Sequence, residues 1–177
     1  MTLWFEHDLY DQLQLIQILD WFNQQQREST ELCLVQASDY LGRQKPDVIA
    51  ELAKTTKWVS QKQLDLASEA WQAFTLNKPI ELNNLITKDT SVLPWLNMAI
   101  NRLLKEYPNK EQGLPQTEKM ILECLEKGDL TAVALFSAYA KKEELEFMGD
   151  STFWWRLNQM ALGENKLVAL SNSQKVN

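Results

Sequence analysis

The hydrophobic positions of the chain begin with a short unbroken run that is followed by a periodic pattern. The run covers residues 3–5 (Leu-Trp-Phe) and predicts a buried strand. Apolar residues then recur three or four positions apart, which predicts one face of an α-helix ending near Gln26. These positions are Leu9, Leu13, Ile16, Leu19 and Phe22. Leu15, Ile18 and Trp21 widen the stripe, so we expect a helix that is mostly covered.

A second unbroken apolar run covers residues 32–35 (Leu-Cys-Leu-Val) and predicts a parallel strand buried on both faces. Strand, helix and strand in this order form a βαβ unit, whose crossover is almost always right-handed. The predicted fold class is therefore mixed α/β and mostly helical, with a partial βαβ unit, a Rossmann-like half, at the N-terminus. Ligands bind at the C-terminal edge of such sheets. The polar residues expected to gather there are Glu6, His7, Asp8, Asp11, Gln12, Ser38 and Asp39.

This strand-end cluster has a structural and a functional interpretation. Asp8 stands where a helix N-cap would stand, and acidic side chains suit a helix N-terminus. A lone histidine after a strand is usually a hydrogen-bonded structural residue. In the functional interpretation Glu6, His7 and Asp8 are catalytic, with Glu6 or His7 as general base. The ligand-binding residues are then Asp11, Gln12, Ser38 and Asp39.

The only cofactor that the cluster suggests is a divalent metal ion. Four carboxylates repel an anion unless a cation bridges them, and the segment lacks the glycine-rich turn of a phosphate site. Carboxylate oxygens suit Mg²⁺ or Mn²⁺. The predicted metal ligands are Asp8, Asp11 and Asp39.

Residues 3–12 (Leu-Trp-Phe-Glu-His-Asp-Leu-Tyr-Asp-Gln) resemble a segment of a bacterial family known as domain of unknown function 1835. Further likeness lies in residues 70–74, 113–118 and 147–154, so the chain resembles the C-terminal two-thirds of the family. The resemblance implies an α/β N-terminal part and a helical C-terminal part, and no activity. Family members carry a long segment before the first strand, and two parallel strands alone make a poor sheet. We therefore expect either strands from a second copy or a shortened family member.

The remaining pattern predicts a series of helices in two domains. Ser60 with Gln63 forms a capping box at the start of one of them. The expected helices cover residues 47–54, 60–74, 80–86, 94–107, 117–127, 130–140 and 152–162. The last is expected to be capped by Ser151 and ended by Gly163. Residues 108–113 are predicted to form a linker. The predicted domains are therefore 1–107 and 113–172, with a frayed tail at 173–177.

Three helices followed by an expected strand at residues 167–170 predict a winged-helix-like C-terminal domain. As a DNA reader it would use residues 152–162, but Thr117 to Leu162 carry five basic and eight acidic residues, a net charge of −3. The charge argues against nucleic acid and favours protein binding or packing. The consecutive Phe153, Trp154 and Trp155 cannot all face one side of a helix, so at least one is expected at an interface.

The bulk properties narrow the class of protein. The 177 residues carry a net charge of −6, which argues against non-specific binding to nucleic acid or anionic membranes. The sequence has no apolar run long enough to span a membrane and no basic leader, so we expect a cytoplasmic protein. Cys33 and Cys124 lie in apolar patterns and are expected to be buried free thiols.

Three functions stay open at this stage. The first is an enzyme or small-ligand protein that uses the strand-end cluster. The second is an interaction or regulatory module that uses the C-terminal domain. The third is a shortened family member that forms a homo-oligomer or folds poorly.

Overall fold

The protein is described here by a computed structural model that covers residues 1–25, 31–144, 148–162, 164 and 166–171. The chain divides into two compact units, Met1–Leu104 and Lys105–Asn177. In the described ranges it forms eight α-helices, one 3₁₀ helix and one three-stranded sheet, which confirms a mixed α/β and mostly helical class. Each helix in these ranges is too short or too polar to cross a lipid bilayer.

The first unit contains the sheet and five α-helices. In chain order its elements are β1 (Thr2–Phe5), α1 (Leu9–Gln24), β2 (Cys33–Gln36), η1 (Leu41–Arg43), α2 (Pro46–Ala53), β3 (Lys57–Trp58), α3 (Gln61–Thr75), α4 (Ile80–Leu85) and α5 (Leu96–Leu104). The predicted end of the first helix, near Gln26, lies outside the described residues, and α1 itself ends at Gln24.

The sheet has the order β1-β2-β3. β1 and β2 are parallel, with Leu3 opposite Leu34, and α1 connects them as the pattern predicted. β3 runs antiparallel to β2, with Trp58 opposite Cys33. The chain thus supplies a third strand itself, which the sequence pattern did not predict because two residues show no alternation.

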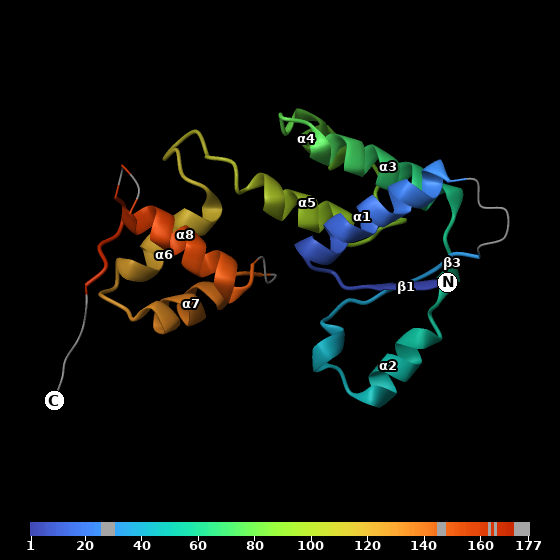
Figure 1. Cartoon of the computed structure of the whole chain (residues 1–177), viewed down its shortest axis with the longest axis horizontal. Helices are drawn as coiled ribbons and strands as arrows, with labels where there is room; N and C mark the ends of the chain where they lie inside the picture. The colour runs from blue at the N-terminus through green and yellow to red at the C-terminus, as the bar shows by residue number, and fades with distance from the viewer. Residues whose placement is uncertain (26–30, 145–147, 163, 165, 172–177) are drawn as a thin grey trace. The chain divides into compact units, whose positions relative to one another are not determined.

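The core of the first unit lies between α1 and the elements that cover it. Leu15, Ile16 and Leu19 of α1 are fully buried, and α1 packs against α3, α5 and β1. Figure 1 shows α1, α3 and α5 on one side of the strands. Trp21, which was expected to widen the covered stripe of α1, is instead 55% exposed.

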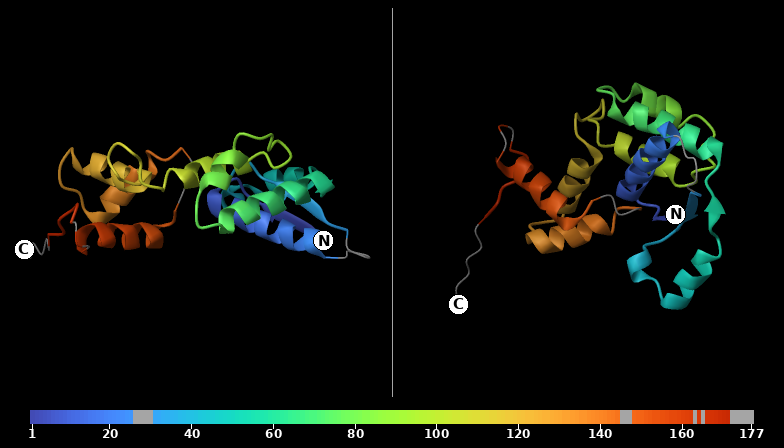
Figure 2. Two further views of the ribbon diagram at one scale, coloured as in Figure 1. Left: turned by 90° about the horizontal axis from the view of Figure 1, so that it is seen from above. Right: turned by 45° about the vertical axis from the view of Figure 1, so that its right-hand side comes forward.

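α2 lies on the other side of the sheet, as Figure 1 and the right-hand view of Figure 2 show. Pro46 occupies its first turn, where a missing N–H costs nothing. None of its eight residues, all of them described, is buried. Its apolar residues Val48, Ile49 and Leu52 are only partly covered, so α2 is a weakly anchored element.

The start of α3 follows the predicted capping box. The Ser60 hydroxyl accepts from the Gln63 N–H, and the Gln63 side chain accepts from the Ser60 N–H at 2.9 Å. Two N–H groups that a helix start leaves open are satisfied in this way. The helix places Leu64, Ala67 and Ala70 in the core.

The second unit contains α6 (Gln116–Leu125), α7 (Ala132–Ala140) and α8 (Asp150–Leu162). Its interior includes Ile121, Tyr139 and Phe153, which are almost fully buried. Trp155 on α8 is exposed, which agrees with the expectation that the three consecutive aromatic residues cannot share one face. Ser151 is not a cap, because α8 already begins at Asp150. The predicted helix end at Gly163 lies outside the described residues.

The strand predicted at residues 167–170 is wrong. The Leu167 and Val168 N–H groups both donate to the Met160 carbonyl oxygen, at 2.8 and 3.4 Å, so the segment folds back onto the end of α8. The second unit has no strand in its described residues with which this segment could pair. The wing of the predicted winged helix is therefore missing from residues 166–171, and the tail at 173–177 lies outside the described residues.

Residues 108–113 form an ordered turn of the second unit. The Asn109 carboxamide oxygen accepts from the N–H groups of Glu111 and Gln112, and its nitrogen donates to the Leu114 carbonyl. Gly113 has φ +69°, a left-handed conformation that favours glycine. The predicted linker lay at these residues, whereas the two compact units divide at Leu104.

The α1–α3 packing can be tested with Leu64→Ala, which removes a fully buried side chain. We expect a loss of about 2–5 kcal/mol in the free energy of unfolding, because a buried Leu→Ala change also leaves a cavity. Urea unfolding followed by circular dichroism measures this loss. The matched control is Leu76→Ala at the exposed end of α3, which should change little. Equal stabilities for both variants would contradict this packing.

Candidate functional site

The end of β1 and the start of α1 are joined by Asp8. One oxygen of its carboxylate, Oδ1, accepts from the N–H groups of Tyr10 at 2.9 Å and Asp11 at 3.2 Å. Its backbone is extended, and the helix begins at the next residue. The predicted N-cap role of Asp8 is therefore confirmed.

Three carboxylates converge at this junction. Ligand atoms of Glu6, Asp8 and Asp11 all lie within 4.8 Å of one another. Each carboxylate is held by backbone N–H groups through one oxygen. Glu6 Oε1 accepts from Leu41 N–H at 2.7 Å, and Asp11 Oδ2 accepts from Glu6 N–H at 2.5 Å. The second oxygen of each carboxylate makes no hydrogen bond to the described residues and remains for a ligand.

The three carboxylates affect one another electrostatically. Burial raises the pKa of Asp11 above the usual aspartate range, and the neighbouring Asp8 charge raises the pKa further. The hydrogen bond from Glu6 N–H and the nearby His7 lower the pKa of Asp11 and only partly offset this. A positive charge near Asp11 would therefore stabilise its ionised carboxylate.

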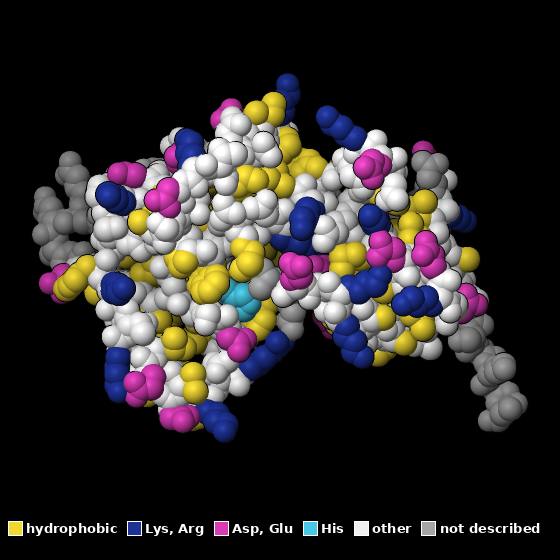
Figure 3. All heavy atoms as spheres, turned by 180° about the vertical axis from the view of Figure 1, so that it is seen from behind, with side chains coloured by type: hydrophobic (Ala, Val, Ile, Leu, Met, Phe, Trp, Pro, Cys, Tyr) yellow, Lys and Arg dark blue, Asp and Glu magenta, His cyan; other side chains and the backbone are white. Residues whose placement is uncertain are grey.

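His7 is only 7% exposed and lies beside two aromatic rings. Its ring meets Tyr40 edge-on at 5.0 Å between centroids and Trp95 at 6.2 Å. The Arg43 guanidinium lies 4.4 Å from the centre of the Tyr40 ring. Figure 3 shows hydrophobic side chains next to the histidine on this face. Among the described residues, neither His7 Nδ1 nor Trp95 Nε1 has a hydrogen-bond partner, although both atoms are buried.

Gln12 belongs to the same region, as the sequence predicted. It is fully buried, and its Nε2 donates to the Glu6 carbonyl oxygen at 2.7 Å. Its Oε1 has no partner in the described part of the chain, and the same holds for Oε1 of Gln36 at the end of β2. Gln12 thus fixes the backbone between β1 and α1 through its Nε2. Its Oε1 is a buried acceptor that a ligand could use.

Ser38 and Asp39 lie in the loop after β2, and both are exposed. The two Asp39 oxygens accept from Tyr40 N–H at 2.7 Å and from Gln44 Nε2 at 2.8 Å. Asp39 therefore turns towards its own loop, and the group of possible metal ligands in the described residues contains Glu6 in its place. The structure brings Glu6, Asp8, Asp11 and Gln12 together with His7 close by, and leaves Ser38 and Asp39 at the rim.

Three residues of the site were not predicted from sequence. Tyr40 and Arg43 follow the second strand, and this position in the strand-end loop could have marked them as residues of the site. Trp95 lies in the turn before α5, and nothing in the local sequence links it to His7.

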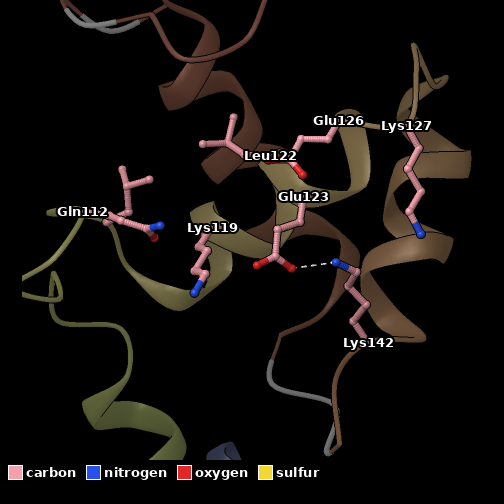
Figure 4. A pocket seen from close by; sticks show the side chains of 8 residues that line it. Gln112, Lys119, Leu122, Glu123, Glu126, Lys127 and Lys142 are labelled. Carbon is pink, nitrogen blue, oxygen red and sulfur yellow. Dashed lines mark hydrogen bonds and ion pairs between the residues drawn. The ribbon is translucent and has the colours of Figure 1, made fainter.

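The second unit contains pockets of its own. One of about 570 Å³ lies against α6, and Figure 4 shows the side chains that line it. Glu123 Oε2 pairs with Lys142 Nζ at 2.7 Å, which lowers the pKa of Glu123 and raises the pKa of Lys142. The charged side chains that line this pocket lie on a solvated surface. The two cysteines are free thiols as predicted, with Cys124 buried and Cys33 only partly so.

Comparisons with protein-family models, with curated proteins and with solved structures give no match to this chain. The resemblance of residues 3–12 to the domain of unknown function 1835 family therefore stays a prediction. The assignment of the site depends on its own contacts, burial and charges.

The environment of Asp11 can be tested through the pH dependence of stability. The pKa of Asp11 is raised in the folded state, so protonated Asp11 adds to the free energy of unfolding. This stabilisation is fully present below the ordinary aspartate pKa and is lost as the pH rises through the raised pKa. Asp11→Asn removes this titration, while its amide oxygen can still accept from Glu6 N–H. In a chelating buffer we expect the variant to gain stability relative to wild type from acidic to neutral pH, by less than about 1 kcal/mol because Asp11 is partly exposed. Urea unfolding across pH measures the difference.

The matched control is Asp65→Asn, which removes one negative charge from an exposed position of α3. A pH-dependent gain of the same size in both variants would assign the effect to the net charge of −6 and not to the site.

Proposed function

We propose that the protein binds a divalent cation, Mg²⁺ or Mn²⁺, through Glu6, Asp8 and Asp11 at the C-terminal ends of β1 and β2. The observation that carries this proposal is the convergence of three carboxylates within 4.8 Å, each held by a backbone N–H through one oxygen. Two buried neighbouring atoms, His7 Nδ1 and Gln12 Oε1, have no hydrogen-bond partner among the described residues, which supports a ligand at the same place.

The chemistry of these ligands fits hard cations. Mg²⁺ and Mn²⁺ prefer carboxylate oxygens, and Mg²⁺ often keeps several waters, so three carboxylates suffice as protein ligands. Ligands whose second oxygen is hydrogen-bonded are better oriented for a metal. A cation would also offset the repulsion between Asp8 and Asp11 that raises the pKa of Asp11. With Glu6 taken up as a cation ligand, His7 would then serve as the general base next to the bound cation.

A second candidate function is protein interaction through the second unit, and α7 favours it. The helix reads Ala-Val-Ala-Leu-Phe-Ser-Ala-Tyr-Ala, yet Val133 is 72% exposed and only Leu135 and Tyr139 are buried. A helix that is apolar on nearly all sides is normally covered. On α8 of the same unit, Trp155 and Leu162 are also exposed.

Several finer interpretations stay predictions. The parallel β1 and β2 with α1 between them support a Rossmann-like half, and α6, α7 and α8 support a winged-helix-like domain without a wing. Membership of the domain of unknown function 1835 family depends on residues 3–12, and a cytoplasmic location on composition. The net acidic charge argues against a nucleic-acid partner.

Thermal unfolding with and without metal tests the cation site. A ligand at about a hundred times its dissociation constant adds roughly 2.7 kcal/mol, which corresponds to about 5–10 °C for a chain of this size. We expect Mg²⁺ or Mn²⁺ to raise the melting temperature of wild type by this amount. Glu6→Gln and Asp11→Asn should abolish the shift.

Asp39→Asn is the sharpest control, because Asp39 was a predicted metal ligand that the structure places outside the group of three carboxylates. It should keep the full shift. Loss of the shift in Asp39→Asn with retention in Glu6→Gln would reverse the ligand assignment, and no shift in wild type with any divalent cation would rule out the site.

The apolar surface of α7 predicts self-association, with a second copy of the chain as the simplest partner. Sedimentation of wild type should show a mass that rises with concentration. Val133→Glu should restore the monomer, because it places a charge in the contact. Leu76→Glu, at an exposed apolar position of the first unit, should behave as wild type. A monomeric wild type at all concentrations argues against this contact.

A further inference from the structure

His7, which stands between Glu6 and Asp8 in the chain, and its neighbour Trp95 each bury a ring nitrogen, Nδ1 and Nε1, that has no hydrogen-bond partner in the described residues. Buried polar groups without partners are rare in folded proteins because their lost hydration is not replaced. Here two such atoms belong to neighbouring rings, whose centroids lie 6.2 Å apart. A ligand with two acceptor oxygens between the rings would supply both missing partners.

The hydrogen-bonding chemistry of these two nitrogens specifies which groups a ligand must present to them. The indole Nε1 is a donor only, and His7 Nδ1 donates in one of its two neutral tautomers. Both are satisfied by a hydrogen-bond acceptor. The strongest acceptors for N–H groups are the oxygens of carboxylate and phosphate groups.

An anion at this place needs positive charge, because Glu6, Asp8 and Asp11 lie beside His7. The proposed cation supplies that charge and leaves coordination positions for an oxygen ligand. The Tyr40 ring that meets His7 itself has its centre 4.4 Å from the Arg43 guanidinium.

We propose that the site takes a small oxyanion, a phosphate or carboxylate group, whose oxygens bridge the bound cation and the ring nitrogens of His7 and Trp95. This inference rests on the proposed cation site. Tyr40 and Trp95 cover His7 from a loop and a turn and not from a helix or strand.

Calorimetric titration of the whole chain with inorganic phosphate and with acetate, each with and without Mn²⁺, tests the proposal. We expect at least one anion to bind in the presence of Mn²⁺ and neither to bind in its absence. Trp95→Phe keeps an aromatic ring but removes the donor, and should weaken anion binding about tenfold or more while leaving Mn²⁺ binding intact. Trp58→Phe, at an exposed position of β3, is the matched control and should bind as wild type.

A second pair of variants tests His7 in the same way. His7→Asn keeps a donor close to the position of Nδ1 and should bind the anion better than His7→Phe, which has none. Binding of phosphate alone identifies a phosphoryl ligand, and binding of acetate alone a carboxylate ligand; either outcome supports the oxyanion site. Mn²⁺ binding without anion binding, or equal anion affinity in Trp95→Phe and wild type, overturns the inference and leaves the cation site standing. Absence of Mn²⁺ binding overturns both.

Discussion

The burial of α1 is the constraint on which the first unit depends. Leu15, Ile16 and Leu19 have no solvent exposure, and each such side chain contributes roughly 1.5–3 kcal/mol when it leaves water. α1 packs against α3, α5 and β1 at once, so its position along its own axis is fixed. Asp8 and Asp11 occupy the first turn of this helix and its cap. The packing of α1 therefore also fixes where the carboxylates lie.

In the described part of the chain, the hydrogen bonds that orient the carboxylates come from backbone N–H groups. The N–H groups that hold them belong to Glu6, Tyr10, Asp11 and Leu41, of which only Leu41 comes from the loop after β2. Parallel strands bring that loop to the end of β1, since both strands end at the same edge. The site thus follows from the βαβ connection, which positions acceptors and donors that are 35 residues apart in the chain.

The parts of this arrangement that the sequence predicted are those with a local signal. Apolar runs marked β1 and β2, periodicity marked α1, and the position of Asp8 marked the cap. The failures concern contacts between distant residues. β3 is two residues long and pairs only because β2 offers an open edge, and Trp95 reaches His7 through the placement of α5. Asp39 was expected in the site because it follows β2, but the nearer donors of Tyr40 and Gln44 take both its oxygens.

The weak anchoring of α2 has a consequence for the dynamics of the site. A helix of eight residues without a buried side chain has little stability of its own, so its amide hydrogens should exchange at a free energy far below that of global unfolding. Residues 37–45, which carry Tyr40 and the Leu41 N–H that holds Glu6, lead directly into α2. When α2 opens locally, this loop loosens while α1 and its core remain folded. The loop that carries Tyr40 and Leu41 can therefore move, while Asp8 and Asp11 stay in place at the start of α1.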